Sequence, residues 1–131
     1  MQPKVYNCVL CEDVRLEKDG RATLLGFVAV APFPRVVISS LVQDRLSFMF
    51  GLSGGGRHKL DCLIRERDKE EKIWRSEVGS ADLANGRFYN LIFEARNVKF
   101  PSYGEYELVF LSDEDEIWKS ILNIQPSEGA E

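Results

Sequence analysis

The chain has 131 residues, of which 44% are hydrophobic and 29% charged, and its formal net charge is −4. This length fits one domain that buries a core without disulfide or metal support, and the composition excludes the disordered and collagen-like classes. Scattered Lys and Arg residues argue against nucleic-acid binding, and the absence of an apolar run of ~20 residues argues against a membrane span.

The cysteine content and the first residues of the chain predict a compartment. Three cysteines cannot all pair with one another, so reduced thiols are the simpler expectation. The stretch before Glu12 holds no long apolar segment of the kind found in secretory signals. Both features predict a cytoplasmic protein.

A hairpin is predicted at the start of the chain. Val5–Leu16 and Arg21–Val30 are rich in β-formers, and Asp19-Gly20 between them is a strong turn signal. Centring the turn there gives the pairs Leu16–Thr23, Val14–Leu25 and Leu10–Ala29. Glu12 then falls in an apolar row, which predicts a β-bulge that turns its carboxylate outward, or a partner such as Arg15.

The next segments alternate less clearly. Ala31–Pro34 ends the second strand, because proline lacks the donor that a ladder needs. Val36–Gln43 fits a strand, a helical turn or a loop. Arg45–Leu52 is predicted to be a strand that ends at Gly54–Gly56 and places every second residue on one apolar face: Leu46, Phe48, Phe50 and Leu52.

The middle of the chain has two competing interpretations. His58–Arg67 and Lys72–Val78 fit a pair of strands, whereas Lys59–Arg75 fits a helix by propensity. The helix would leave more than two turns without an inward apolar residue, so we prefer the strands. Gly79–Gly86 reads as a loop and Phe88–Val98 as another strand.

The last hairpin has the clearest alternation. Apolar residues alternate over Tyr106–Phe110 and again over Trp118–Ile124, and the acidic turn Ser112–Glu116 joins the two strands. Pairing across the turn places Phe110 beside Trp118 and Leu111 beside Ile117. One domain is predicted over residues 1–125, followed by a flexible polar tail over 126–131.

About seven to nine short strands without a helix predict an all-β antiparallel β-sandwich of immunoglobulin-like or C2-like type. Gly104-Glu105-Tyr106 resembles the start of the penultimate strand of immunoglobulin-like sandwiches, where a tyrosine fixes a corner.

Several short motifs extend a resemblance over nearly the whole chain. They are Leu10–Arg15, Asp19-Gly20, Leu24–Gly26, Pro32–Pro34 and Phe100–Tyr106. Their order resembles a family of small bacterial β-sandwich proteins known only as a domain of unknown function. The resemblance implies the fold and carries over no catalytic residue.

Two glycine-rich patterns overlap between the middle strands. Gly51-Leu52-Ser53-Gly54-Gly55 matches the G-x-S-x-G motif of serine hydrolases, which needs a helix after the serine and a histidine late in the chain. The lone histidine, His58, follows Ser53 by only five residues. Gly51–His58 also imitates a phosphate-binding loop, but Arg57-His58 replaces its Lys and Ser/Thr. A hairpin turn explains both patterns.

Metal-ligand types occur in two places. Cys8, Cys11, His58 and Cys62 make a zinc set on paper, but strand residues three apart face opposite sides and those four apart lie about 13 Å from each other. The acidic turn at residues 112–116, with Asp82, is a calcium candidate that a solvated turn explains as well. We therefore expect no cofactor and no metal.

Two further sites are candidates. The polar group Glu12, Asp13 and Arg15 is a carboxylate site or a bulge with a salt bridge, and we favour the bulge. On the last hairpin one face is filled by core residues, yet the opposite face is also apolar: Val109, Leu111, Ile117 and Ile121. Such a patch needs a cover, either from Val36–Gln43 or from a second chain.

The main functional interpretation is a non-catalytic module that binds another protein or its own copy. The alternative is a sandwich that binds calcium, a carbohydrate or a small molecule. A serine hydrolase acting through Ser53 is the remote alternative.

Overall fold

The computed structural model describes residues 2–32 and 35–127. Within these residues the chain forms ten β-strands and no helix. The strands are β1 (Lys4–Leu16), β2 (Ala22–Val30), β3 (Val36–Ile38), β4 (Val42–Ser53), β5 (Gly56–Glu66), β6 (Lys72–Arg75), β7 (Gly79–Leu83), β8 (Phe88–Lys99), β9 (Gly104–Ser112) and β10 (Asp115–Pro126). The all-β class is confirmed, and the strand number exceeds the prediction because of the short strands β3 and β7.

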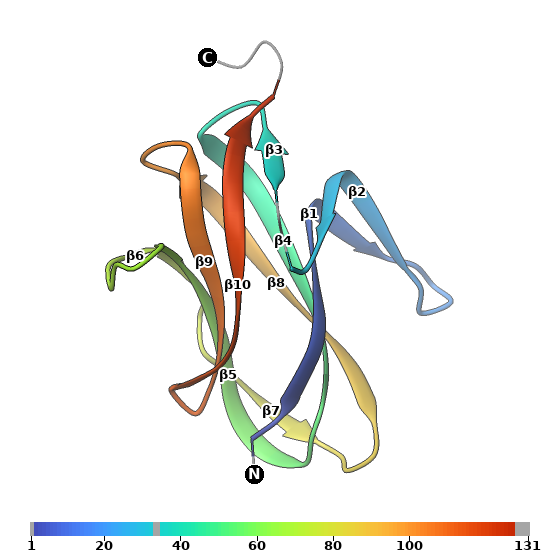
Figure 1. Cartoon of the computed structure of the whole chain (residues 1–131). Helices are drawn as coiled ribbons and strands as arrows, with labels where there is room; N and C mark the ends of the chain where they lie inside the picture. Colours follow the sequence, from blue (N-terminus) through green and yellow to red (C-terminus); the bar gives the residue numbers. More distant parts are fainter. Residues whose placement is uncertain (1, 33–34, 128–131) are drawn as a thin grey trace.

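Two sheets face each other in a sandwich-like arrangement (Figure 1). One sheet has the order β2-β1-β4-β8, and the other has the order β3-β10-β9-β5-β6, with β7 also paired to β5. Neighbouring strands run antiparallel, except that β3 runs parallel to the end of β10. Val36–Gln43, which the sequence left open, therefore contains β3 and the first residues of β4.

No helix capable of crossing a membrane occurs in the part of the chain that the structure describes.

Strand pairing decides the two uncertain segments of the middle. β5 and β6 pair antiparallel, so the strand interpretation of Lys59–Arg75 is confirmed. The loop predicted for Gly79–Gly86 is wrong, because β7 pairs with the start of β5. Leu83 is buried and Ala81 packs against the core. The alternate residues of β7, Ser80 and Asp82, favour loops, and the tertiary pairing with β5 overrides that local preference.

The β1–β2 hairpin contains the bulge that the sequence predicts. Its register shifts between Cys11 and Asp13, where Gly26 and Phe27 of β2 both oppose Glu12. The φ of Gly26 is +81°, the left-handed conformation that glycine supplies at this type of bulge. Glu12 is exposed and lies over this glycine, where a Cβ would collide with its carboxyl group.

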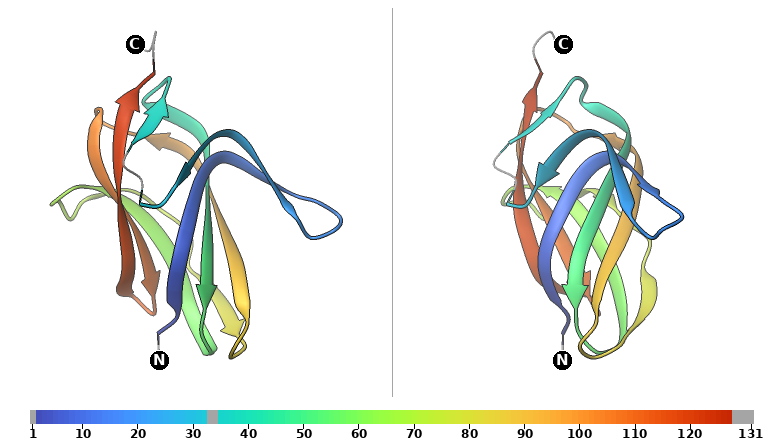
Figure 2. Two further views of the ribbon diagram at one scale, coloured as in Figure 1. Left: turned by 45° about the vertical axis from the view of Figure 1, so that its right-hand side comes forward. Right: turned by 90° about the vertical axis from the view of Figure 1, so that its right-hand side faces the viewer.

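The bulge also changes the register toward the turn. The pair Leu10–Ala29 is confirmed, whereas the pairs beyond the bulge are Val14–Leu24 and Leu16–Ala22, one residue away from the prediction. The extra residue lies in β2, which a register counted from the turn cannot detect. Beyond the bulge the hairpin projects from the sandwich as an arm, as Figure 2 shows.

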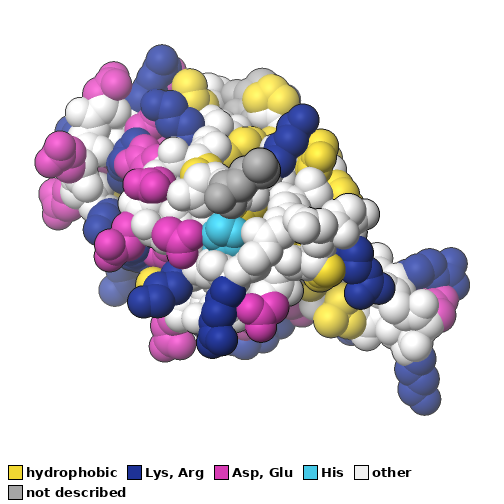
Figure 3. Space-filling model, turned by 90° about the horizontal axis from the view of Figure 1, so that it is seen from below, with side chains coloured by type: hydrophobic (Ala, Val, Ile, Leu, Met, Phe, Trp, Pro, Cys, Tyr) yellow, Lys and Arg dark blue, Asp and Glu magenta, His cyan; other side chains and the backbone are white. Residues whose placement is uncertain are grey.

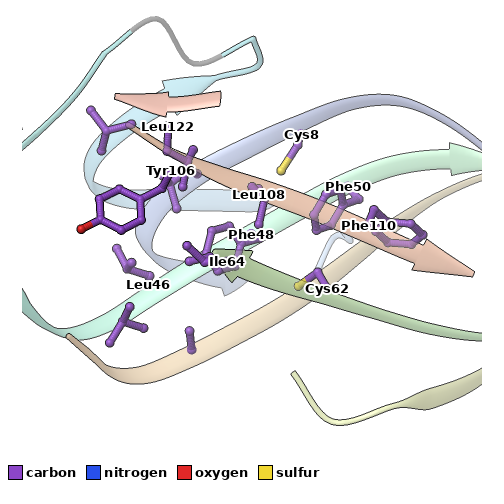
Figure 4. Close-up of a cluster of buried hydrophobic side chains, with 14 of the residues drawn as sticks. Cys8, Leu46, Phe48, Phe50, Cys62, Ile64, Tyr106, Leu108, Phe110 and Leu122 are labelled. Carbon is purple, nitrogen blue, oxygen red and sulfur yellow. The ribbon is translucent and has the colours of Figure 1, made fainter. Parts of the chain in front are cut away.

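The core lies between the two sheets and is rich in aromatic rings (Figure 4). The predicted inward row of β4 is buried, and so are Leu60, Cys62 and Ile64 of β5. Phe50 is central, with ring centroids 4.7 Å from Phe110, 5.6 Å from Trp118 and 5.8 Å from Phe93. Burial of a side chain of this size contributes about 1.5–3 kcal/mol, so this cluster dominates the contact between the sheets.

The tyrosine that the sequence placed at a corner forms one. The Tyr106 hydroxyl donates to the carbonyl of Ser102 at 2.7 Å and accepts from the N–H of the same residue at 3.3 Å. The Tyr106 ring is buried against Phe100, with centroids 5.0 Å apart. These bonds fix the turn before β9, and hence the start of the β9–β10 hairpin.

Candidate functional site

The β9–β10 hairpin buries most of the residues predicted to form an outer interface. Val109 and Leu111 are 0% and 6% exposed. The ladder shifts at Glu116, which opposes Leu111 in place of Ile117, and Ile117 packs against the main core. Ile121, 37% exposed, remains on the surface. These residues therefore do not form the exposed patch on which the interface prediction rested.

Charged side chains of the same sheet cover its outer face. The outer apolar cluster comprises Leu63, Val109 and Leu111. Arg65 donates through Nε to Glu107 at 3.0 Å and through both Nη atoms to Glu116 at 2.7 and 3.0 Å. Lys119 Nζ lies 3.3 Å from Glu107. Because aliphatic stems of charged residues cover apolar surface, this network accounts for the burial of Val109 and Leu111 within the chain itself.

The ion pairs also set the charge state of the network. Burial alone would raise the pKa of Glu107, but the bonds from Arg65 and Lys119 hold that pKa below its ordinary value. The Arg65 guanidinium likewise lowers the pKa of Glu116. Both carboxylates are therefore ionised at neutral pH and their oxygens are committed to neighbouring cations.

The polar group at the first bulge is divided by the structure. Asp13 Oδ2 accepts from Arg45 of β4 at 2.8 Å, and Asp13 Oδ1 accepts from the N–H of Val14 at 2.9 Å. Glu12 points outward over the bulge, and Arg15 is exposed on the arm. Asp13 is thus a structural anchor for the arm, with Arg45 as its partner in place of Arg15.

His58 connects two turns at one end of the sandwich. Its Nε2–H donates to the carbonyl of Gly55 at 2.8 Å, and its Nδ1 lies 2.8 Å from Asp113 Oδ2. A carbonyl and an ionised carboxylate both accept, so these contacts favour the doubly protonated ring, and the Asp113 bond followed by the Gly55 bond raises the pKa of His58. Ser112 Oγ lies 3.5 Å from the same Nδ1. No ring nitrogen is left to accept a proton from a serine.

The remaining motifs lie on strands and turns. Ser53 is the last residue of β4, and its Oγ donates to the hydroxyl of Tyr6 at 3.0 Å. The glycine-rich pattern is therefore the turn between β4 and β5. Cys8, Cys11 and Cys62 are free and buried, and burial raises the pKa of each thiol. In residues 2–32 and 35–127, no three His, Cys, Asp or Glu side chains are placed to share an ion.

The acidic turn does not gather its carboxylates. Asp113 Oδ1 accepts from the N–H of Lys59, and Asp115 accepts from Gln2 at 3.1 Å. Asp113 and Glu114 have φ values of +50° and +72°, as the two central residues of a tight type I′ hairpin turn require. Figure 3 looks at this end of the molecule and shows positive and negative side chains interspersed rather than separated by sign.

A concave feature runs along β10 and the first residues of β1. It is a groove of about 800 Å³. One wall is formed by Tyr6 and Asn7 of β1, and the other by residues of β10 from Trp118 onward. Ala31 and Pro32 lie at the β3 end of the groove, and the Gln2–Asp115 hydrogen bond closes the other end of β10.

Within residues 2–32 and 35–127, the groove wall on β10 is a strand edge with no paired strand. Ser127 donates its N–H to the carbonyl of Ile38 in β3, at 2.9 Å, so odd-numbered residues of β10 direct backbone groups to this side. The ladder to β9 is regular over residues 118–124, so the same alternation holds along the groove. The open edge consists of Lys119, Ile121 and Asn123. Among the described residues, β3 is the strand on this side, and it pairs only with Ile124–Pro126.

The outer face of the β2-β1-β4-β8 sheet carries a second exposed feature that sequence reasoning missed. An apolar row crosses all four strands: Val30, Val9, Met49 and Ile92. Each strand contributes one residue, so only the pairing register brings the row together. It offers apolar surface, whereas the groove combines apolar surface with backbone donors and acceptors.

The fold and groove define an all-β, two-sheet protein with an open strand edge. The chain belongs to a family of unknown function, DUF6941, whose model matches residues 7–125. This membership confirms the resemblance to a family of unknown function that the sequence motifs indicate. No curated protein matches the chain closely enough to count as a relative.

Proposed function

We propose that the protein is a non-catalytic binding module that takes up an extended polypeptide segment by strand addition to β10. The observation that carries this proposal is the open edge of β10 along the wall of the groove. Strand addition uses main-chain hydrogen bonds for affinity and alternate side chains for specificity. The open edge offers main-chain donors and acceptors, and the groove offers surfaces for the alternate side chains.

The dimensions of the site favour a single strand. From Trp118 to Asn123 the edge spans five residue steps, about 17 Å at the rise of a β-strand. β1 stands opposite this edge, so the groove has a wall on each side. At the same rise per residue, an edge of this length accommodates a bound segment of about five to seven residues.

The character of the open edge supports uptake of a partner rather than simple protection. Proteins often block a strand edge with a lysine, and Lys119 occupies such a position. Here Lys119 lies 3.3 Å from Glu107, on the outer face of its own sheet. Ile121, the middle residue of the open edge, presents an apolar side chain to the groove.

We also propose that the sandwich is of immunoglobulin-like type and works in a reducing compartment such as the cytoplasm. The hydrogen bonds of Tyr106 to the turn before the penultimate strand support the fold type. Three free, buried cysteines support the compartment.

A proline scan of β10 tests strand addition. The N–H of Ile121 points to the groove, so Ile121→Pro removes one donor of the open edge and leaves the ladder to β9 intact. Leu122→Pro removes a ladder bond instead and is expected to unfold the hairpin. Ile121→Val is the matched control, because it keeps the N–H and a β-branched side chain.

The probe is a displayed library of random peptides about twelve residues long, selected on the wild-type protein. Affinities of the enriched peptides are measured by fluorescence anisotropy with variants shown to be folded by urea unfolding. We expect Ile121→Val to bind normally and Ile121→Pro to bind at least about tenfold more weakly. The absence of enriched peptides, or equal binding to the proline variant, would contradict the proposal. If a selected peptide matches a segment of this chain, the partner is a second copy.

A further inference from the structure

The outer rim of the groove has one carboxylate that the fold does not use. Its charged side chains are Arg67, Asp68, Glu105, Glu107 and Lys119. Arg67 pairs with Glu105, and Lys119 pairs with Glu107. Asp68 lies in the turn after β5 with a φ of +62°, and its carboxylate enters no ion pair with another described residue. The hydrogen bond to Glu105 raises the pKa of Arg67 and the charge of Asp68 contributes to this shift, but the rim still holds three carboxylates against two cations, a net charge of −1.

An added strand would present its side chains to two different environments. Residues of a strand alternate between the two faces of the sheet. On β10 the even-numbered residues Trp118, Ser120 and Leu122 turn toward the space between the sheets, and the open-edge residues turn toward the rim. A strand paired with β10 continues both faces. Its inward side chains meet the half-buried ring of Trp118, and its outward side chains meet the rim.

We infer that the bound segment alternates apolar inward residues with basic outward residues, an inference that rests on the strand addition proposed above. Trp118 supplies the apolar contact for the inward residues. Asp68 supplies the charge complement, since both cations of the rim already have acidic partners. The net charge of −4 also favours the approach of a cationic segment.

Two synthetic peptides of equal length test this inference. One alternates valine with lysine and the other alternates valine with glutamate, and both are measured by anisotropy at low salt. We expect the lysine peptide to bind the wild-type protein at least about tenfold more tightly than the glutamate peptide. Asp68→Asn should narrow this ratio about two- to fivefold, the size of one exposed ion pair. Asp44→Asn, an exposed carboxylate outside the groove, should leave the ratio unchanged.

The outcomes separate this inference from the proposed function. Equal binding of the two peptides, with both abolished by Ile121→Pro, refutes the basic pattern and leaves strand addition in place. If the lysine peptide binds Ile121→Pro as tightly as the wild type, it binds elsewhere on the surface, which contradicts both the basic pattern and strand addition. If Asp68→Asn and Asp44→Asn change the ratio of the two peptide affinities equally, the preference for lysine comes from net charge, and the role of Asp68 is refuted.

Discussion

Removal of Arg65 should destabilise the protein more than its position on the outer face suggests. In Arg65→Ala the carboxylate of Glu107, only 10% exposed, keeps Lys119 as its one cation, which costs about 1–2 kcal/mol. The bond to the half-exposed Glu116 adds about 0.5–1 kcal/mol after solvent screening. Uncovering Leu63 and Leu111 by some tens of Å² adds about 1 kcal/mol. The expected loss is about 2–4 kcal/mol.

Urea unfolding followed by tryptophan fluorescence measures this loss. Arg67→Ala is the matched control, because Arg67, directly after β5, pairs with Glu105 of β9 but both side chains are half-exposed, so little change is expected. Arg65→Met should fall between the two, since methionine keeps the apolar cover and loses the charge. If Arg65→Ala costs no more than Arg67→Ala, the account of how the outer apolar cluster is covered is wrong.

Three other predictions follow from buried groups. Tyr106→Phe removes both bonds to the backbone of the turn before β9 and should lower the free energy of unfolding by about 1–2 kcal/mol, read from the urea midpoint. His58 has a raised pKa, so its stabilising charge is fully present below its ordinary pKa of about 6.5 and is lost as pH rises through the raised value. Stability should therefore fall from about pH 6 to pH 9 more steeply in the wild type than in Asp113→Asn, and parallel curves would refute the assignment. Cys8 and Cys62 are buried thiols with raised pKa, so a disulfide exchange reagent should modify them only as fast as the protein opens, and rapid modification in the folded state would contradict their burial.

Local patterns in the sequence predict the features that depend on neighbours in the chain. The bulge opposite Glu12 follows from a carboxylate in an apolar row, and the corner at Tyr106 follows from a short motif. The strand at β7 was missed because its pairing with β5 is a tertiary effect. In the last hairpin the predicted pair Phe110–Trp118 is confirmed, but Leu111 pairs with Glu116 in place of Ile117, because the shift at Glu116 has no signal in the alternation of apolar residues.

The candidate site lies beyond what one sequence can show. Alternation predicts that Ile121 is on a strand and outside the core, as it is. Whether its backbone N–H is free depends on which strand lies beside β10. That strand, β3, pairs with residues 88 positions later in the chain, and the sequence left its structure open. The same limit applies to the cover over Val109, which comes from Arg65 on a different strand.

Amide hydrogen exchange along β10, followed by NMR, tests the central claim most directly. The open edge of β10 predicts fast exchange of the Ile121 amide in the free protein and slow exchange of the neighbouring Ser120 and Leu122 amides, which face β9. Addition of a library-selected peptide should slow exchange at Ile121 and leave the two neighbours unchanged. Slow exchange at Ile121 without a peptide, or no change on its addition, would show that β10 has no open edge for an added strand.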